Sequence, residues 1–281
     1  MPTAQVENGE IYFEESGTGE LIVLMAGLGH GAAYFEKTLP VLGRIGRAVA
    51  IDPRGVGRST SRREEFSVEA WAQDVAGLVE ALGAKRAHLV GSSLGACVAL
   101  QAAVDFPDRV ASLVVVAGFS ELDRSLELNF RLRIEIIEKL GLGDALAAHI
   151  AMWTLGRDFI NTPAGREAVE RLYASVRRNS PGRYLAFIRA ILQFGRCEPG
   201  QEGQPKLTER LAEIRVPTCV IVGGQDILTP VSQSRQVASQ IPGAEVYVIP
   251  GCGHITFSEK PDETAKLVGD FLRRVTSAKN S

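Results

Sequence analysis

The sequence lacks any long hydrophobic run, any block of charge of one sign and any paired cysteine motif. Its 281 residues contain 31 basic and 33 acidic side chains, which give a net charge of -2. Without a basic block there is no electrostatic footprint for nucleic acid or an anionic membrane surface, so we expect neither as a partner. No apolar run approaches membrane-spanning length, and residues 1–19 lack the basic start and apolar stretch of a signal peptide. We therefore expect a cytoplasmic protein.

Cysteine and histidine are both scarce. The four cysteines, Cys97, Cys197, Cys219 and Cys252, show neither paired spacing nor a Cys-x-x-Cys motif, which favours reduced thiols over disulfides or a zinc site. Only four histidines are present, which argues against a polyhistidine metal centre. We therefore expect no metal and no cofactor. What the chain does have is 45% apolar residues, enough for a large core in one domain or in a domain with an insertion.

Apolar runs typical of buried strands alternate with helical patterns along most of the chain. These runs lie at 21–25, 48–51, 87–90, 112–117, 216–222 and 245–249. The alternation predicts an α/β fold, with a mostly parallel central sheet and helices on both faces. Before the first run, Asn8-Gly9 predicts a hairpin turn. We also expect a helix over 33–42 and another from Ser67 as N-cap to Gly83.

Residues 119–205 break this alternation. Pro163 after Thr162 and Pro181 after Ser180 each resemble an N-cap followed by a first-turn proline. Residues 126–136 alternate with a period of two, but helix formers dominate there, so we expect a helix. The segment is therefore predicted to be an all-helical insertion. It divides the chain into a first core part at 1–118, the insertion at 119–205 and a second core part at 206–281.

A Gly-x-Ser-x-Gly pattern stands between a strand and a helix. In Gly91-Ser92-Ser93-Leu94-Gly95, the glycines allow neighbouring segments to approach a tight turn that lifts Ser93 above the sheet. The Leu94 N–H would lie at a helix N-terminus, where positive potential favours an oxyanion. The alternative is an ordinary strand-loop-helix connection that contains serine, since 29 glycines make a chance match common.

Two further residues follow later strands. Asp226 comes after Gly223-Gly224, and His254 comes after Gly253, so both are expected at the strand ends where Ser93 lies. Alone, Asp226 could be a helix N-cap and His254 a loop imidazole. Together, in the order Ser, Asp, His, they predict a catalytic triad. His254 would take the proton of the weakly nucleophilic Ser93 hydroxyl, while Asp226 would orient the ring and stabilise its cation.

The predicted oxyanion site uses two backbone amides, those of Leu28 and Leu94. Substrate contacts are expected from Gly27, His30 and Trp153, although His30 could instead face solvent or cap a turn, and Trp153 could belong to the core of the insertion. The remaining candidates have structural interpretations. Asp52 and Arg54 are expected to brace their loop, His88 to face outward, Cys252 to fill space, and Ser92 to pack below the turn.

These motifs resemble the α/β-hydrolase superfamily over almost the whole chain. The resemblance rests on the elbow at 91–95, Asp52-Pro53-Arg54-Gly55 with the residues after it, Asp226 after Gly223-Gly224, and Gly253-His254. It implies an α/β-hydrolase fold with a helical cap inserted at 119–205. Within the superfamily the chain looks most like the 3-oxoadipate enol-lactonase and aminoacrylate hydrolase group. It departs from many relatives in having Ala26-Gly27 where they have His-Gly at the oxyanion turn.

The expected activity is that of a cofactor-independent serine hydrolase. It would cleave a carboxylic ester or lactone of a small organic substrate through an acyl-enzyme intermediate. Relatives that use a carboxylate in place of the elbow serine attack by a different route, and Ser93 points to acyl transfer instead. Two alternatives stay open: the same triad could serve carbon–carbon bond hydrolysis, perhydrolysis or another cofactor-free reaction, or the chain could be a non-catalytic binding protein. Substrate identity and oligomeric state are not readable from the sequence.

Overall fold

The computed structural model describes residues 2–197, 200–201 and 205–277. An eight-stranded sheet runs in the order β1-β2-β4-β3-β5-β6-β7-β8, and only the pairings of β2 with β1 and with β4 are antiparallel. The strands are β1 Thr3–Val6, β2 Gly9–Ser16, β3 Leu21–Met25, β4 Arg47–Ile51, β5 Ala87–Ser92, β6 Val110–Val116, β7 Thr218–Gly223 and β8 Glu245–Ile249. The predicted mostly parallel sheet is confirmed, and the predicted hairpin is present, with Glu7-Asn8 as its turn and Gly9 as the first residue of β2.

Each parallel strand in the middle of the sheet is buried on both faces. Successive side chains point to opposite sides, so Val23 joins one apolar cluster while Ile22 and Leu24 join the other. Leu89 and Val90 of β5 divide in the same way. This two-sided burial explains why these strands are continuous apolar runs in the sequence and not alternating ones.

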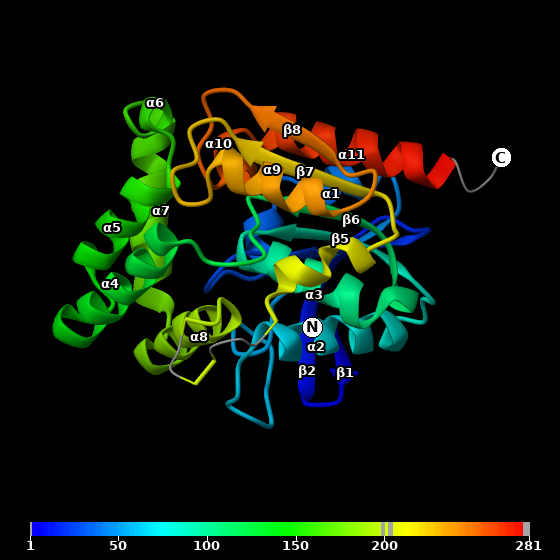
Figure 1. The fold of residues 1–281 in the computed structure, drawn as a ribbon, viewed down its shortest axis with the longest axis horizontal. Helices are drawn as coiled ribbons and strands as arrows, with labels where there is room; N and C mark the ends of the chain where they lie inside the picture. Colours follow the sequence, from blue (N-terminus) through cyan, green and yellow to red (C-terminus); the bar gives the residue numbers. More distant parts are fainter. Residues whose placement is uncertain (1, 198–199, 202–204, 278–281) are drawn as a thin grey trace.

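Helices cover both faces of the sheet (Figure 1). The two layers comprise α1 Leu39–Leu42, α2 Val68–Ala81, α3 Leu94–Asp105, α9 Val231–Gln240, α10 Thr256–Glu259 and α11 Pro261–Ser277, with short 3₁₀ turns η1 Ala32–Phe35, η2 Pro107–Arg109 and η3 Leu207–Glu213. Helices α2 and α3 pack together on one face, whereas α1 and α11 pack on the other. The Ser67 hydroxyl accepts a hydrogen bond from the Ala70 amide, as expected of an N-cap.

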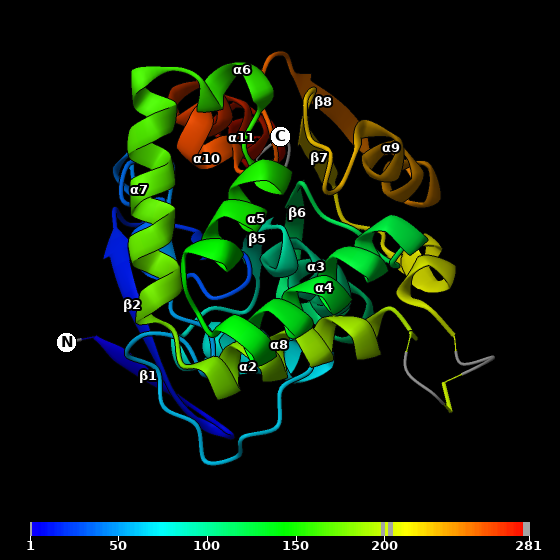
Figure 2. The same ribbon diagram turned by 90° about the vertical axis from the view of Figure 1, so that its left-hand side faces the viewer.

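A helical cap is inserted between β6 and β7, and lies in front of the sheet in Figure 2. Its helices are α4 Arg124–Leu140, α5 Asp144–Thr154, α6 Arg157–Ile160, α7 Pro163–Arg178 and α8 Pro181–Phe194. The helix expected over 126–136 is present as part of α4. Thr162 caps α7 through its hydroxyl, but the Ser180 side chain makes no such bond at α8. The domain boundaries at 118/119 and 205/206 stay a prediction.

Two local predictions were wrong. Residues 33–42 do not form one helix: they form η1 and the single turn α1, where Pro40 lies in the first turn and Gly43 follows the last. His88 does not face outward. It is 2% exposed, and its ring contacts the Ser112 hydroxyl at 2.7 Å and the Glu20 carboxylate at 2.9 Å, so polar partners compensate its burial.

Two further predictions from the sequence concern the cysteines and membrane-spanning segments. Among the described residues, Cys97, Cys197, Cys219 and Cys252 form no disulfide, and Cys252 is fully buried among apolar side chains. Throughout the part of the chain that the structure describes, every helix is too short or too polar to cross a bilayer.

Candidate active site

Ser93 occupies a sharp turn between β5 and α3. Its backbone angles, φ 54° and ψ -119°, lie in a region that residues with a side chain rarely adopt, which stores strain at this position. Close approach explains the flanking glycines. A Cβ on Gly91 would lie 2.2 Å from the Gly95 carbonyl oxygen, and one on Gly95 would lie 2.2 Å from the Met25 carbonyl oxygen. The turn therefore requires glycine on both sides of Ser93.

His254 and Asp226 meet behind this turn. Both side chains are buried, and the Nδ1 atom of His254 lies 2.8 Å from Oδ2 of Asp226. The other carboxylate oxygen, Oδ1, accepts the backbone amides of Leu228 and Thr229, each at 2.9 Å. The Oδ2 atom of Asp226 thus orients the Nδ1 edge of the imidazole, and the backbone amides of Leu228 and Thr229 hold its Oδ1 atom in place.

Thr229 is a partner that the sequence analysis missed. Its hydroxyl lies 2.9 Å from Oδ2 of Asp226, 3.0 Å from Nδ1 of His254 and 3.1 Å from the Ala117 carbonyl oxygen. Since the hydroxyl carries one proton, it donates to only one of these oxygens at a time. The sequence does carry a signal for this contact, which is the spacing of three residues between Asp226 and Thr229. A threonine at that distance can close a turn over the aspartate carboxylate.

The opposite ring nitrogen of His254, Nε2, is not held by the Asp226 carboxylate. Nε2 is buried and has no hydrogen-bond partner among the described residues, so no hydrogen bond joins it to the Ser93 hydroxyl. Ser93 and His254 nevertheless line the same cavity. Contacts between a nucleophile and its base are often long without substrate, and a free Nε2 is the atom that such a base needs.

The predicted oxyanion amides belong to two residues of the same cavity wall. Leu94 is the first residue of α3, so its amide has no partner within the helix. Leu28 lies in the turn closed by the hydrogen bond from the His30 amide to the Gly27 carbonyl oxygen. A Cβ on Gly27 would lie 3.1 Å from the Ser93 Cβ, so this turn passes directly over the serine.

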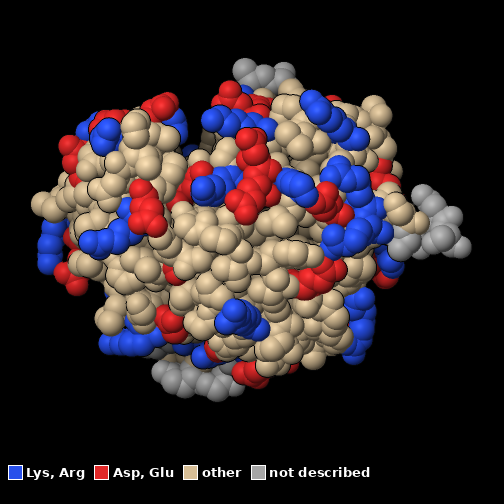
Figure 3. All heavy atoms as spheres, turned by 90° about the horizontal axis from the view of Figure 1, so that it is seen from above, with Lys and Arg blue, Asp and Glu red and all other residues tan. Residues whose placement is uncertain are grey.

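The cavity has a volume of about 480 Å³ and lies between the cap and the core. Of the predicted substrate contacts, Gly27 and His30 line it, whereas Trp153 does not. Trp153 packs against the main apolar cluster, with its ring 6.2 Å from that of His149. Burial lowers the pKa of His30, whose Nδ1 contacts the Leu28 carbonyl oxygen. Figure 3 shows the surface hollowed between the cap and the rest of the molecule.

The loop that carries His254 is fastened to the cap. The His254 amide donates to the Thr154 carbonyl oxygen at 2.8 Å. The buried Glu259 carboxylate accepts the amide of Gly253 at 3.0 Å and that of Gly156 at 3.2 Å. Burial raises the pKa of Glu259, and these hydrogen bonds oppose that effect. One carboxylate therefore links the corner between α5 and α6 to the histidine loop.

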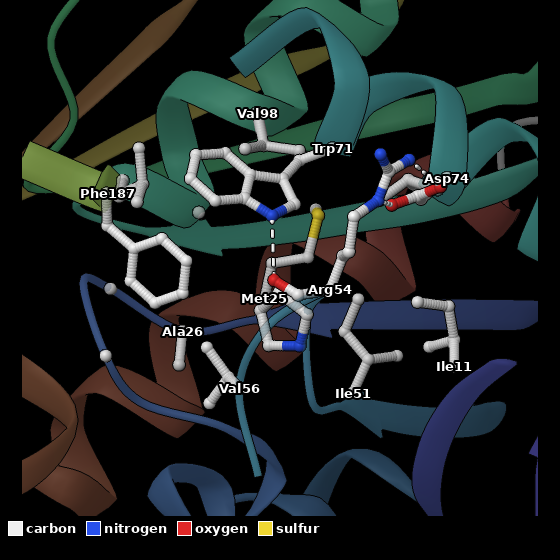
Figure 4. A pocket seen from close by; sticks show the side chains of 16 residues that line it. Ile11, Met25, Ala26, Ile51, Arg54, Val56, Trp71, Asp74, Val98 and Phe187 are labelled. Atoms are coloured by element: carbon white, nitrogen blue, oxygen red, sulfur yellow. Dashed lines mark hydrogen bonds and ion pairs between the residues drawn. The ribbon is translucent and has the colours of Figure 1, made fainter. Parts of the chain in front are cut away.

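A second buried carboxylate, that of Asp74, is paired with Arg54 (Figure 4). The Arg54 Nε donates to Oδ2 of Asp74 at 2.7 Å and its Nη2 donates to Oδ1 at 2.5 Å, both groups being buried. The Trp71 indole donates to the Arg54 carbonyl oxygen. Asp52 in turn accepts the amides of Ala32 and Arg58. Asp52 and Arg54 thus brace their loop, and the hollow of about 30 Å³ beside them is far too small for a substrate.

Other residues of the main cavity also escaped the sequence analysis. Tyr34, Arg133 and Tyr184 line it, and the Ser92 hydroxyl lies 3.5 Å from that of Tyr34. No motif marks these residues, because their positions depend on how η1 and the cap helices pack. Within the described residues, no group of three or more His, Cys, Asp or Glu side chains is placed to hold a metal ion.

Comparison with known proteins places this geometry in context. A family model described as the alpha/beta hydrolase fold matches residues 20–261. A protein of Azorhizobium caulinodans named as a carbamate hydrolase, RutD, is 30% identical over 281 residues, covering 98% of this chain and 99% of its own. The malate-bound structure of a thermophilic esterase from Thermogutta terrifontis is 25% identical and has a TM-score of 0.83. The match covers 98% of this chain and 99% of the esterase. An enol-lactonase from Burkholderia xenovorans LB400 shares the fold, with a TM-score of 0.83 at 23% identity. The match covers 97% of this chain and 100% of the enol-lactonase.

Proposed function

The chain belongs to the α/β-hydrolase fold family, and from that premise we propose that it is a serine hydrolase acting on a carboxylic ester or lactone of a small organic molecule. Ser93 is the nucleophile, His254 the base and Asp226 the acid that orients it. The amides of Leu28 and Leu94 form the oxyanion hole. In this proposal no metal or cofactor takes part in the reaction. The proposed location of the protein is the cytoplasm.

The proposed reaction is an acyl transfer in two halves. The Ser93 oxygen attacks the carbonyl carbon while its proton passes to Nε2 of His254, and the negative oxygen receives the two backbone amides. The bond to the leaving alcohol then breaks as His254 returns the proton to that alcohol. In a lactone, the alcohol stays attached to the acyl group. Water, activated by His254, finally hydrolyses the acyl-enzyme and restores Ser93.

The observation that carries this proposal is the state of the His254 ring. One nitrogen is bound by a buried carboxylate at 2.8 Å, and the other is unpartnered in the cavity that the strained Ser93 also lines. A histidine that served only the core would have both nitrogens satisfied, as His88 does.

A carbamate is the second candidate substrate class, because of the relative named as a carbamate hydrolase. The same serine, base and oxyanion amides would serve, since a carbamate also presents a carbonyl carbon to Ser93. Hydrolysis of aryl carbamates beside aryl esters of matched size distinguishes the two classes by their relative kcat/KM.

A fluorophosphonate probe and p-nitrophenyl esters of varied chain length test the proposal. We expect the wild type to be labelled by the probe and to release p-nitrophenol in a burst, and both signals to vanish in Ser93→Ala. In Ser92→Ala, the matched neighbouring change, labelling persists. A wild type that is neither labelled nor active on esters and carbamates would contradict the proposal and favour a binding protein.

A further inference from the structure

Arg133 is a buried cation in the wall of the proposed active-site cavity. It lies on α4 of the cap, is only 3% exposed, and lines the same cavity as Ser93 and His254. Burying a guanidinium removes it from water, which costs free energy unless an anion compensates. Its surroundings therefore decide whether it serves the fold or a ligand.

No carboxylate accompanies Arg133 among the described residues. Its guanidinium lies 5.1 Å from the centre of the Phe130 ring, and its nearby polar group is the Tyr184 hydroxyl, which favours the charged form. Its Nε and Nη2 atoms are buried without any hydrogen-bond partner. Burial lowers the pKa of Arg133, yet an arginine keeps its proton in proteins. No anion among the described residues therefore compensates the positive charge.

Arg54 shows how this chain compensates a buried arginine that serves the fold. It binds both oxygens of Asp74 through Nε and Nη2, the side-on arrangement that matches a carboxylate. Arg54 and Arg133 are the two buried arginines of the described residues. Arg133 leaves free the same pair of nitrogens that Arg54 uses, and that pair belongs to a residue of the substrate cavity.

The charge of the remaining lining also favours an anion. The exposed rim contributes Lys37, Arg171 and Arg178 against two acids, Glu36 and Glu167. Glu167 forms an ion pair with Arg171, so the basic side chains stay in excess. Basic side chains around an opening raise the local concentration of an anionic substrate.

We propose that the substrate carries a carboxylate at a distance from its ester or lactone carbonyl, and that Arg133 binds this carboxylate through Nε and Nη2. The scissile carbonyl lies at Ser93 while the carboxylate enters the cap, where the Tyr184 hydroxyl is available as a further donor. This inference rests on the proposed function, because it assigns the other end of a substrate that Ser93 attacks.

A kinetic experiment compares esters that differ in one charge. The substrates are p-nitrophenyl monoesters of straight-chain dicarboxylic acids of increasing length, each paired with the ester in which a carboxamide replaces the far carboxylate. For the best-fitting length we expect the wild type to favour the carboxylate by at least about tenfold in kcat/KM. Arg133→Met abolishes this preference and changes the carboxamide rate little, whereas Arg133→Lys retains part of it. Arg124→Gln, an exposed arginine on the same helix, serves as the matched control and keeps the full preference.

A binding experiment decides the inference without catalysis. In Ser93→Ala, we expect an aliphatic monocarboxylate to raise the melting temperature more than the amide of the same length, and Arg133→Met in that background to abolish the difference. Arg133→Met alone should melt no lower than wild type, because it removes an uncompensated buried charge. A clear loss of stability would instead identify Arg133 as a structural residue.

The two arms separate failure of this inference from failure of the proposed function. Equal rates on charged and neutral esters, or a preference that survives in Arg133→Met, would overturn the carboxylate site while leaving the serine hydrolase intact. If no ester is cleaved, the proposed function fails. The melting experiment then still supports the carboxylate site, when its shift depends on Arg133, or overturns it when it does not.

Discussion

Thr229 supports the proposed pair of Asp226 and His254 with a single hydroxyl. Its hydroxyl contacts both the Asp226 carboxylate and Nδ1 of His254, and Thr229 is not itself one of the residues that line the cavity. Its role is therefore positioning: it limits how the carboxylate and the imidazole can rotate against each other. Such partners commonly hold a ring in its working orientation.

Replacing Thr229 with valine should lower kcat about fivefold to tenfold while KM changes little. Valine keeps the shape but removes a hydroxyl whose hydrogen bond contributes about 1 kcal/mol. The pH profile of kcat should also move, because the Asp226 carboxylate that stabilises the imidazolium loses a donor. Steady-state kinetics on a chromogenic ester measure both effects. Thr218→Val, a buried change on β7, is the control; similar losses in both variants would mean a general structural effect.

At the level of residues, the sequence locates the residues of the proposed triad better than their supporting partners. Ser93, Asp226 and His254 stand in motifs that follow strands, so their placement at one edge of the sheet follows from the order of the parallel strands. Arg133 carries no such signal. It is one of several charged residues on a helix with mixed polarity, and only the packing of α4 against the cavity decides that it is buried.

Between elements, the contact of α3 with the loop after β3 is very close. Gly95 in the first turn of α3 lies against the backbone of Met25 and Ala26, with no space for a methyl group. The approach holds the amide of Leu94 and the turn at Gly27 around Ser93. The proposed activity therefore depends on the spacing of two elements as well as on the side chains they carry.

Gly95→Ala should lower the free energy of unfolding by more than about 2 kcal/mol and reduce ester hydrolysis strongly, since its Cβ would lie 2.2 Å from a backbone oxygen. Gly77→Ala in the interior of α2 is the matched control. Its Cβ would meet Val6 at an ordinary 3.6 Å, so removing a helical glycine should stabilise the protein by about 0.5–1 kcal/mol. Urea unfolding measures both. A Gly95→Ala variant with wild-type stability and activity would refute the close-approach argument.

Helices and strands differ in how far the sequence predicts them. Strands buried on both faces and helices with an N-cap, such as α2, follow from local patterns. The stretch 33–42 does not. Its apolar residues suit a helix, but Phe35 and Leu42 are fully buried through two short turns separated by residues 36–38. Tertiary packing there outweighs the local preference.

Across the whole molecule, charge in the cap links stability to pH. His149 is buried on α5, accepts a hydrogen bond from the Asn129 amide, and has a pKa lowered to about 4 by burial and by Arg133. In the unfolded chain its pKa is about 6.5. Between these values the unfolded state binds more protons, so folding becomes less favourable as the pH falls.

We therefore expect the free energy of unfolding to fall from pH 6.5 to pH 4, with roughly 3 kcal/mol of the loss due to His149. His149→Gln should flatten this part of the curve, and Arg133→Met should flatten it partly, because it removes a positive charge that disfavours the imidazolium. Urea unfolding across this pH range measures the slopes. Identical slopes in wild type and His149→Gln would show that other groups control acid stability.

The fastening of the cap to the histidine loop has a consequence for how substrates enter. Thr154 and Gly156 are tied to the backbone of His254 and Gly253, directly or through Glu259, so the corner between α5 and α6 cannot move outward without displacing His254. A movement of the cap that admits a substrate without displacing His254 therefore has to occur away from this corner. Substitutions elsewhere in the cap can change which molecules enter while leaving the His254 loop in place, whereas substitutions at the corner would affect both.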